Sequence, residues 1–144
     1  MLKIEFPSYH FKFKKAGDKE YIFDESRKKW VILTPEEWVR QNFLQYLLQV
    51  KNYPGSLIAV EKEIFLNSLK KRCDIIVYKN NIPWMIVECK EQGVKTDEQV
   101  LLQILRYNMA FPVEYLVLTN GETSFGWHRL NGTLAELEEL PGWK

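Results

Sequence analysis

Residues 72–90 read RCDIIVYKNNIPWMIVECK, two apolar runs separated by a short polar break. We predict strands over about 71–79 and 83–90, because both runs are rich in β-branched and aromatic residues. The break at Asn80-Asn81 is typical of the tight turn in a β-hairpin. An antiparallel hairpin with this turn brings Asp74 on the first strand beside Glu88 on the second.

Each predicted strand carries a carboxylate within its apolar run. An ionised carboxylate in such surroundings is costly unless a cation compensates it, so Asp74 and Glu88 indicate a shared cation. Period-two alternation places Glu88 and Lys90 on one face and Cys89 on the other. Two carboxylates and the Cys89 backbone carbonyl suit Mg²⁺, for which Mn²⁺ can substitute. Lys90 would then orient the attacking water or neutralise a phosphate in the transition state.

A helix is predicted before this hairpin, over residues 35–50. Thr34 is suited to cap its N-terminus, and Pro35 suits the first helical position. Glu37 has the spacing to reach back as the partner in a capping box. The sequence Tyr-Pro-Gly at 53–55 ends the helix.

The remaining elements follow from apolar periodicity and turn residues. Further strands are expected near 2–13, 20–23, 28–33, 57–65, 113–119 and 123–130, and a second helix near 96–110. We therefore expect one domain of α/β (α+β mixed) class, with a mixed central sheet flanked by helices. Residues 1–33 form an N-terminal β-hairpin elaboration, 34–130 the core, and 131–144 a short helix or an acidic tail.

The pattern Asp74, then Glu88-Cys89-Lys90, resembles the D…E-x-K motif of the PD-(D/E)XK nuclease superfamily. Gln103 and Tyr107 resemble the Q-x-x-x-Y pair that follows the E-x-K strand in several nuclease branches. Residues 34–110, which begin TPEEWVRQ, are similar to the N-terminal nuclease domain of type I restriction-enzyme R subunits. The resemblance implies a restriction-endonuclease-like αβββαβ core and Mg²⁺-dependent hydrolysis of DNA that leaves a 5′-phosphate.

The resemblance also implies residue roles. Asp74, Glu88 and the Cys89 carbonyl would hold the metal, with Glu37 as an additional metal neighbour. Lys90 would assist the attacking water, and Gln103 and Tyr107 would position the substrate. Two departures from the family stand out. Cys73 replaces the proline of the superfamily name, and no G-x-x-x-x-G-K-[ST] pattern of a nucleotide-driven motor occurs in the sequence.

Alternatives without chemistry remain open for each of these residues. Asp74 is also compatible with an ion pair to Arg72 or to a lysine, and Glu88 with an ion pair to Lys90. Gln103 and Tyr107 are compatible with a solvent-facing helix side, and Glu37 with capping alone. Two other functions stay open accordingly. One is a catalytically silent nuclease fold that binds nucleic acid or a partner protein, and the other is an unrelated α+β scaffold.

Charge and composition narrow the class of protein. The first 72 residues hold 14 basic and 9 acidic side chains, and the other 72 hold 6 and 10. The basic excess gathers in two runs: Lys12, Lys14, Lys15, Lys19, Arg27, Lys28 and Lys29, then Lys70, Lys71 and Arg72. Such runs suit contact with phosphates, although they are also typical of a solvated face. Together with the resemblance, they make DNA the expected partner. A homodimer, or a partner subunit that supplies specificity, is a further expectation.

Cys73 and Cys89 each lie in an apolar run, which is typical of reduced core thiols in an intracellular protein. No stretch is apolar for long enough to span a bilayer, and no signal peptide is visible, so we expect a cytoplasmic protein without membrane contact. Three tryptophans, Trp38, Trp84 and Trp127, are expected in the core. Glu61 and Glu63 are expected at the surface.

Overall fold

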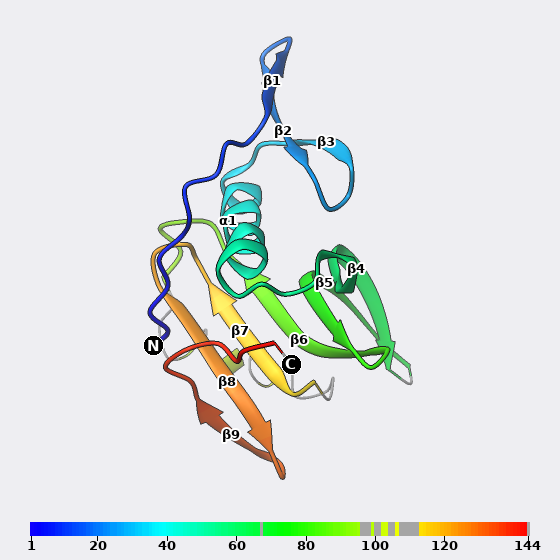
Figure 1. Cartoon of the computed structure of the whole chain (residues 1–144), viewed down its shortest axis with the longest axis vertical. Helices are drawn as coiled ribbons and strands as arrows, with labels where there is room; N and C mark the ends of the chain where they lie inside the picture. Colours follow the sequence, from blue (N-terminus) through cyan, green and yellow to red (C-terminus); the bar gives the residue numbers. More distant parts are fainter. Residues whose placement is uncertain (67, 96–98, 100–101, 104–105, 107–112, 144) are drawn as a thin grey trace.

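The computed structural model describes residues 1–66, 68–95, 99, 102–103, 106 and 113–143. A three-stranded antiparallel sheet comes first and is formed by β1 (Phe13–Ala16), β2 (Lys19–Asp24) and β3 (Lys29–Ile32). Helix α1 (Pro35–Gln45) follows and continues as a π-helical turn, Tyr46–Val50. In Figure 1 the small sheet lies beyond one end of α1, away from the rest of the molecule.

A six-stranded mixed sheet makes up the body of the molecule. Its strands are hydrogen-bonded in sequence order: β4 (Ile58–Leu66), β5 (Leu69–Lys79), β6 (Ile82–Cys89), β7 (Tyr115–Thr119), β8 (Ser124–Leu130) and β9 (Thr133–Glu136). Only the pairing of β6 with β7 is parallel; the other neighbours are antiparallel. A short 3₁₀ turn, Gly55–Leu57, leads into β4. The mixed α+β class is therefore confirmed.

The β5–β6 hairpin has the predicted turn. Asn80 and Asn81 both adopt the left-handed conformation, with φ of 55° and 66°. Asparagine tolerates this region better than most residues, which explains the dipeptide at the turn. Ile75 pairs with Val87, and one further step in the same register sets Asp74 opposite Glu88.

Helix α1 begins at the predicted cap. The Thr34 Oγ1 accepts a hydrogen bond of 3.0 Å from the Glu37 N–H. The reciprocal half of the capping box is not formed, because the Thr34 N–H donates to the Ile32 carbonyl at 3.1 Å. The carboxylate of Glu37 turns inward to buried cations instead.

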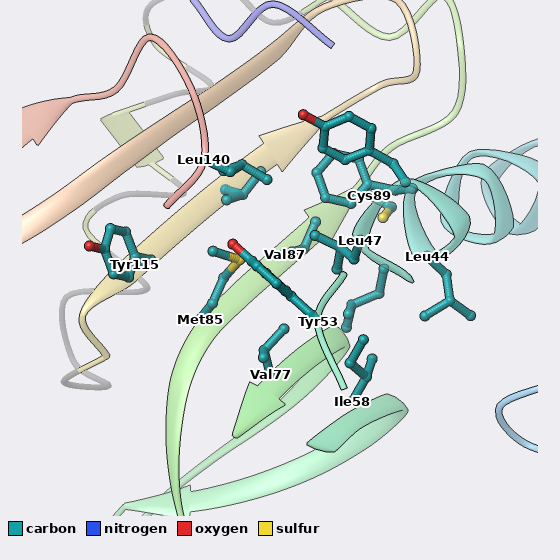
Figure 2. Close-up of a cluster of buried hydrophobic side chains, with 14 of the residues drawn as sticks. Leu44, Leu47, Tyr53, Ile58, Val77, Met85, Val87, Cys89, Tyr115 and Leu140 are labelled. Carbon is teal, nitrogen blue, oxygen red and sulfur yellow. The ribbon is translucent and has the colours of Figure 1, made fainter. Parts of the chain in front are cut away.

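Apolar side chains cover both faces of the large sheet. On one face α1 contributes Val39 and Phe43, and the π-helical turn contributes Leu47, to a cluster that also holds Val87 and Cys89. Figure 2 shows Leu44, Leu47, Val77 and Cys89 converging between the helix and the strands. Ile86 belongs to a second cluster on the opposite face. The predicted alternation along β6 is therefore confirmed.

Both cysteines are free thiols in these clusters, as predicted. Burial raises the pKa of Cys73 to about 12 and raises the pKa of Cys89 well above its usual value. Both thiols therefore stay protonated near neutral pH and act as apolar packing groups.

Three expectations about the chain ends and the core are wrong. Residues 2–12 form no strand, although Leu2 is buried and its N–H donates to the Ser124 carbonyl at 2.8 Å. Residues 133–136 form β9 and not a helix, because Asn131-Gly132 turns the chain back onto β8. Trp38 is 37% exposed and packs on Phe11, whereas Trp84 and Trp127 are buried as predicted.

Within the predicted helix 96–110, the structure describes Gln99, Leu102, Gln103 and Arg106, which are helical and exposed. Across all the residues described, no helix combines the length and the apolar character needed to cross a membrane.

Candidate functional site

Asp74 lies where β5 meets α1 and the end of β6. Its side chain is largely buried, and both carboxylate oxygens have defined partners. Oδ2 accepts a hydrogen bond of 2.8 Å from the backbone N–H of Cys89, and Oδ1 accepts one of 2.8 Å from Arg40. These two bonds fix the orientation of the carboxylate against the backbone of β6.

Glu88 lies beside Asp74 on the neighbouring strand. The Lys71 Nζ stands 2.7 Å from its Oε1. Burial raises the pKa of Glu88 to about 7; the positive charge of Lys71 opposes this shift, and the charge of Asp74 and a hydrogen bond with it reinforce it. The two carboxyl groups therefore lie on adjacent strands, and burial is the main reason why the pKa of Glu88 is raised, with the charge of Asp74 adding to it.

Arg40 supplies a buried positive charge that the sequence analysis did not identify. Its guanidinium forms ion pairs with Asp74 at 2.8 Å, with Glu61 at 2.7 Å and with Glu37. Glu36 lies farther away, at 3.6 Å. Glu61 therefore has a partner in the interior, and its assignment to the surface was incomplete. The sequence could have indicated these ion pairs, because Arg40 follows Glu36 and Glu37 at the i+4 and i+3 spacing that places side chains together on a helix.

Glu37 is held from the side of the small sheet. Arg27 contacts both of its carboxylate oxygens at 2.9 Å, and Gln41 donates to one of them at 3.0 Å. Arg27 also binds Asp24, which is fully buried. Burial alone would raise the pKa of Asp24, but hydrogen bonds from Arg27 outweigh it and lower that pKa. The oxygens of Glu37 thus already have several partners in this structure.

Glu36 is the acidic residue of α1 that lies near Asp74. Burial and the negative charge of Asp74 raise the pKa of Glu36, while Arg40 and Lys90 oppose this shift. Glu36 therefore also brings an acidic group of α1 near Asp74, and the role of Glu37 as a metal neighbour stays a prediction.

Lys90 follows the last residue of β6. Its backbone N–H donates to the Thr119 carbonyl at 2.8 Å, which anchors this position to the end of β7. Its side chain is half-buried, and its charge reaches Glu36. Among the residues described here, its ammonium has no carboxylate within 4.0 Å.

In the described part of the chain, Asp74 forms no ion pair with Arg72, and Glu88 forms none with Lys90. Arg72 pairs with Glu61 at 2.7 Å, and Glu88 pairs with Lys71. The sequence contains one indication that Lys71 is buried: in the period-two alternation of β5, position 71 shares its face with the buried Cys73.

Of the two predicted substrate-positioning residues, the structure describes Gln103. Gln103 is exposed beside Gln99 and Arg106, and no hydrogen bond links it to Asp74, Glu88 or Lys90 in the part of the chain that the structure describes. Tyr107 lies outside the described residues.

The oxygen donors fit a hard divalent cation. Among the described residues, no group of three or more His, Cys, Asp and Glu side chains is arranged to hold a metal. The predicted set is smaller: two convergent carboxylates and the main chain of Cys89. Mg²⁺ commonly binds through one or two carboxylates and keeps several waters. A cation here would also stabilise the ionised form of Glu88, whose pKa is raised to about 7.

Comparison with known families gives one match. A family model described as the N terminus of the type I restriction enzyme R protein matches residues 35–141. The matched range begins at the first residue of α1 and extends past β9, and it excludes the small sheet. Searches of the curated proteins and of the solved structures found no match.

Proposed function

The chain belongs to the family of type I restriction enzyme R protein N termini, and from this we propose that it is a metal-dependent nuclease domain that hydrolyses DNA. The observation that carries the proposal is the convergence of Asp74 and Glu88 on adjacent strands, with the pKa of Glu88 raised to about 7. Carboxyl groups forced together in this way are suited to sharing a divalent cation.

Different residues of the chain would serve different roles in the hydrolysis. Asp74 and Glu88, with the Cys89 carbonyl, would hold Mg²⁺ or Mn²⁺. The cation would supply activation of the attacking water and stabilisation of the leaving oxygen. The Cys89 N–H and Arg40 keep Asp74 in a fixed orientation. Lys90 has no carboxylate within 4.0 Å among the described residues, so its ammonium is available to a scissile phosphate or to the attacking water.

The order of elements supports the finer assignment to the PD-(D/E)XK superfamily. A helix is followed by three antiparallel strands, and β7 then adds parallel to β6 beside the candidate site. Gln103 and Tyr107 keep their proposed role in placing the substrate. On this assignment the cut leaves a 5′-phosphate.

A second candidate function is a nuclease fold that binds DNA or a partner protein without cutting. Arg40 pairs with Asp74 at 2.8 Å, and Lys71 approaches Glu88 to 2.7 Å. Protein cations thus already offset both carboxylates, which is the arrangement expected of a site that needs no metal.

Cleavage of plasmid and single-stranded DNA with Mg²⁺ or Mn²⁺ tests the proposal. We expect the wild type to cut, and Lys90→Ala to lower the rate by about a hundredfold or more while metal binding persists. Lys95→Ala is the matched control, because Lys95 is an exposed lysine on the same connecting segment, and it should cut like the wild type.

Calorimetric titration with Mn²⁺ separates the candidates. Glu88→Gln should weaken metal binding; unchanged affinity would show that the proposed site is wrong. Metal binding at Asp74 and Glu88 without cleavage of either substrate would favour the binding-only function or dependence on another subunit.

A further inference from the structure

The small sheet has two chemically different faces. Pairing sets Lys14 beside Tyr21, Tyr21 beside Ile32, and Phe23 beside Trp30, so these side chains share one face. Ile22 and Asp24 point to the other face, where both are fully buried. We call the first the outer face and the second the inner face.

The inner face packs toward α1. Phe13, which pairs with Ile22, lies with its ring centroid 6.3 Å from that of Trp38 on the helix. The outer face consequently points away from α1, and Figure 1 shows the sheet at the end of the molecule. Within the described ranges, the ring contacts of Tyr21, Phe23 and Trp30 all remain inside residues 12–30.

Lysine ammonium groups lie over the aromatic rings of the outer face. The Lys14 Nζ lies 4.8 Å from the centroid of Trp30 and 5.7 Å from that of Tyr21. The Lys12 Nζ lies 5.6 Å from the centroid of Phe23, whose ring meets Trp30 edge to face at 5.2 Å. Three half-buried rings and two ammonium groups therefore form one continuous surface.

The charge of this face has one sign. The acidic residues of β2, Glu20 and Asp24, belong to the inner face by alternation, and Asp24 is paired with Arg27. The strand positions of the outer face include Lys14 and Lys19 and no carboxylate. The surface is thus complementary to a chain of phosphates.

We propose that the outer face of the β1–β3 sheet binds single-stranded DNA. Bases would stack on Tyr21, Phe23 and Trp30 in place of the ammonium groups of Lys12 and Lys14. These lysines would turn to the flanking phosphates. Aromatic rings combined with basic groups on a sheet are suited to single strands, because unpaired bases expose their flat faces. Bases inside a duplex are stacked on each other and offer no such face.

This inference rests on the proposed function for the choice of DNA, but the surface lies outside residues 35–141, which carry the family match. The inner face connects to the candidate site through Asp24, Arg27 and Glu37, and then through Arg40 to Asp74. A DNA strand held on the outer face would therefore lie on the sheet whose inner face these ion pairs join to the proposed metal ligand.

Fluorescence anisotropy with a labelled thymidine oligonucleotide tests the inference on the full chain in EDTA, where no metal-dependent cleavage takes place. Lys14→Ala and Trp30→Ala should each weaken binding by about tenfold. Trp30→Phe keeps a ring for stacking and should restore most of the affinity. Lys62→Ala is the matched control, because Lys62 lies 4.8 Å from the Tyr78 ring on the large sheet, and it should leave affinity unchanged.

Circular dichroism of each variant identifies those that fail to fold. If Trp30→Ala fails to fold, the test rests on the affinity of Lys14→Ala. Equal affinity of wild type and Lys14→Ala would overturn the inference, and so would binding of duplex DNA as tight as that of the single strand. Failure of the nuclease proposal has a different signature: no cleavage with metal, yet oligonucleotide binding that still depends on Lys14 and Trp30.

Discussion

Arg40 is the residue on which the buried charges of the site converge. Its side chain is 7% exposed and pairs with Glu37, Glu61 and Asp74. Replacing it with alanine leaves these carboxylates without their shared cation, so we expect a loss of about 3–5 kcal/mol in the free energy of unfolding. Urea denaturation followed by tryptophan fluorescence measures this loss.

Arg72 provides the control for that prediction. It pairs with Glu61 at 2.7 Å, but its side chain is 59% exposed. Solvent screens such a pair, and Arg72→Ala should cost less than about 1 kcal/mol. Equal losses from the two substitutions would contradict a central role for Arg40.

Glu88 should give the metal-free protein a characteristic dependence on pH. Burial raises its pKa from 4.5 to about 7, so the folded chain retains a proton that the unfolded chain has already lost between these values. The contribution of Glu88 to the free energy of unfolding therefore falls by about 1–3 kcal/mol as the pH rises from 4.5 to about 7. Denaturation in EDTA between about pH 5 and about pH 8 should show this loss in the wild type relative to Glu88→Gln. A difference between the two proteins that stays constant with pH would contradict the raised pKa.

Among single residues, the sequence indicated the acidic residues Asp74 and Glu88 but not the basic residue Arg40. Asp74 and Glu88 could be found because each interrupts an apolar strand, where a charge is costly and needs a reason. Arg40 could not be matched to Asp74 in the same way. They lie 34 positions apart in the chain, and their contact at 2.8 Å depends on how α1 packs across the sheet.

Among the elements, α1 controls the geometry of the site because it carries both Glu36 and Arg40. Its first turn is held by Thr34, whose Oγ1 accepts from the Glu37 N–H at 3.0 Å. Thr34→Ala removes this acceptor and should lower the free energy of unfolding by about 1 kcal/mol. Thr34→Ser keeps the hydroxyl and should stay close to the wild type in the same urea titration. A serine variant as unstable as the alanine variant would argue against capping as the cause.

Elements with strong local signals were predicted well, and elements defined by distant partners were not. Apolar alternation and the Asn80-Asn81 turn located β5 and β6 closely. The acidic residues of 131–144 suggested a helix or tail, yet Asn131-Gly132 returns the chain to pair with β8. Residues 2–12 have strand-like composition, but their hydrogen bonds depend on distant partners: Leu2 bonds to Ser124 of β8, and Lys12 bonds to Phe23 of β2.

At the scale of the whole molecule, buried ion pairs connect the two sheets. Asp24 of β2 binds Arg27, Arg27 binds Glu37 of α1, Glu37 binds Arg40, and Arg40 binds Asp74 of β5. Gln41 adds a bridge between Asp24 and Glu37, with hydrogen bonds of 2.9 and 3.0 Å. The small sheet is therefore joined to the candidate site by charges as well as by apolar packing.

This connection predicts energetic coupling between residues that do not touch. In a double-mutant cycle, Arg27→Met and Asp74→Asn should be non-additive by about 1 kcal/mol, because each changes the charge balance around Glu37 and Arg40. Unfolding free energies of the wild type, the two single variants and the double variant give the coupling directly.

The cycle of Arg27→Met with Lys62→Ala supplies the comparison, since Lys62 lies on the Tyr78 ring of the large sheet and none of its contacts in the described chain involves these ion pairs. That cycle should be additive within about 0.5 kcal/mol. If the cycle of Arg27 with Asp74 were equally additive, the two sheets would be joined by packing alone. The candidate site would then be independent of events at the small sheet. Coupling confined to the Asp74 cycle would instead mean that the ion pairs through Glu37 and Arg40 join Arg27 energetically to Asp74.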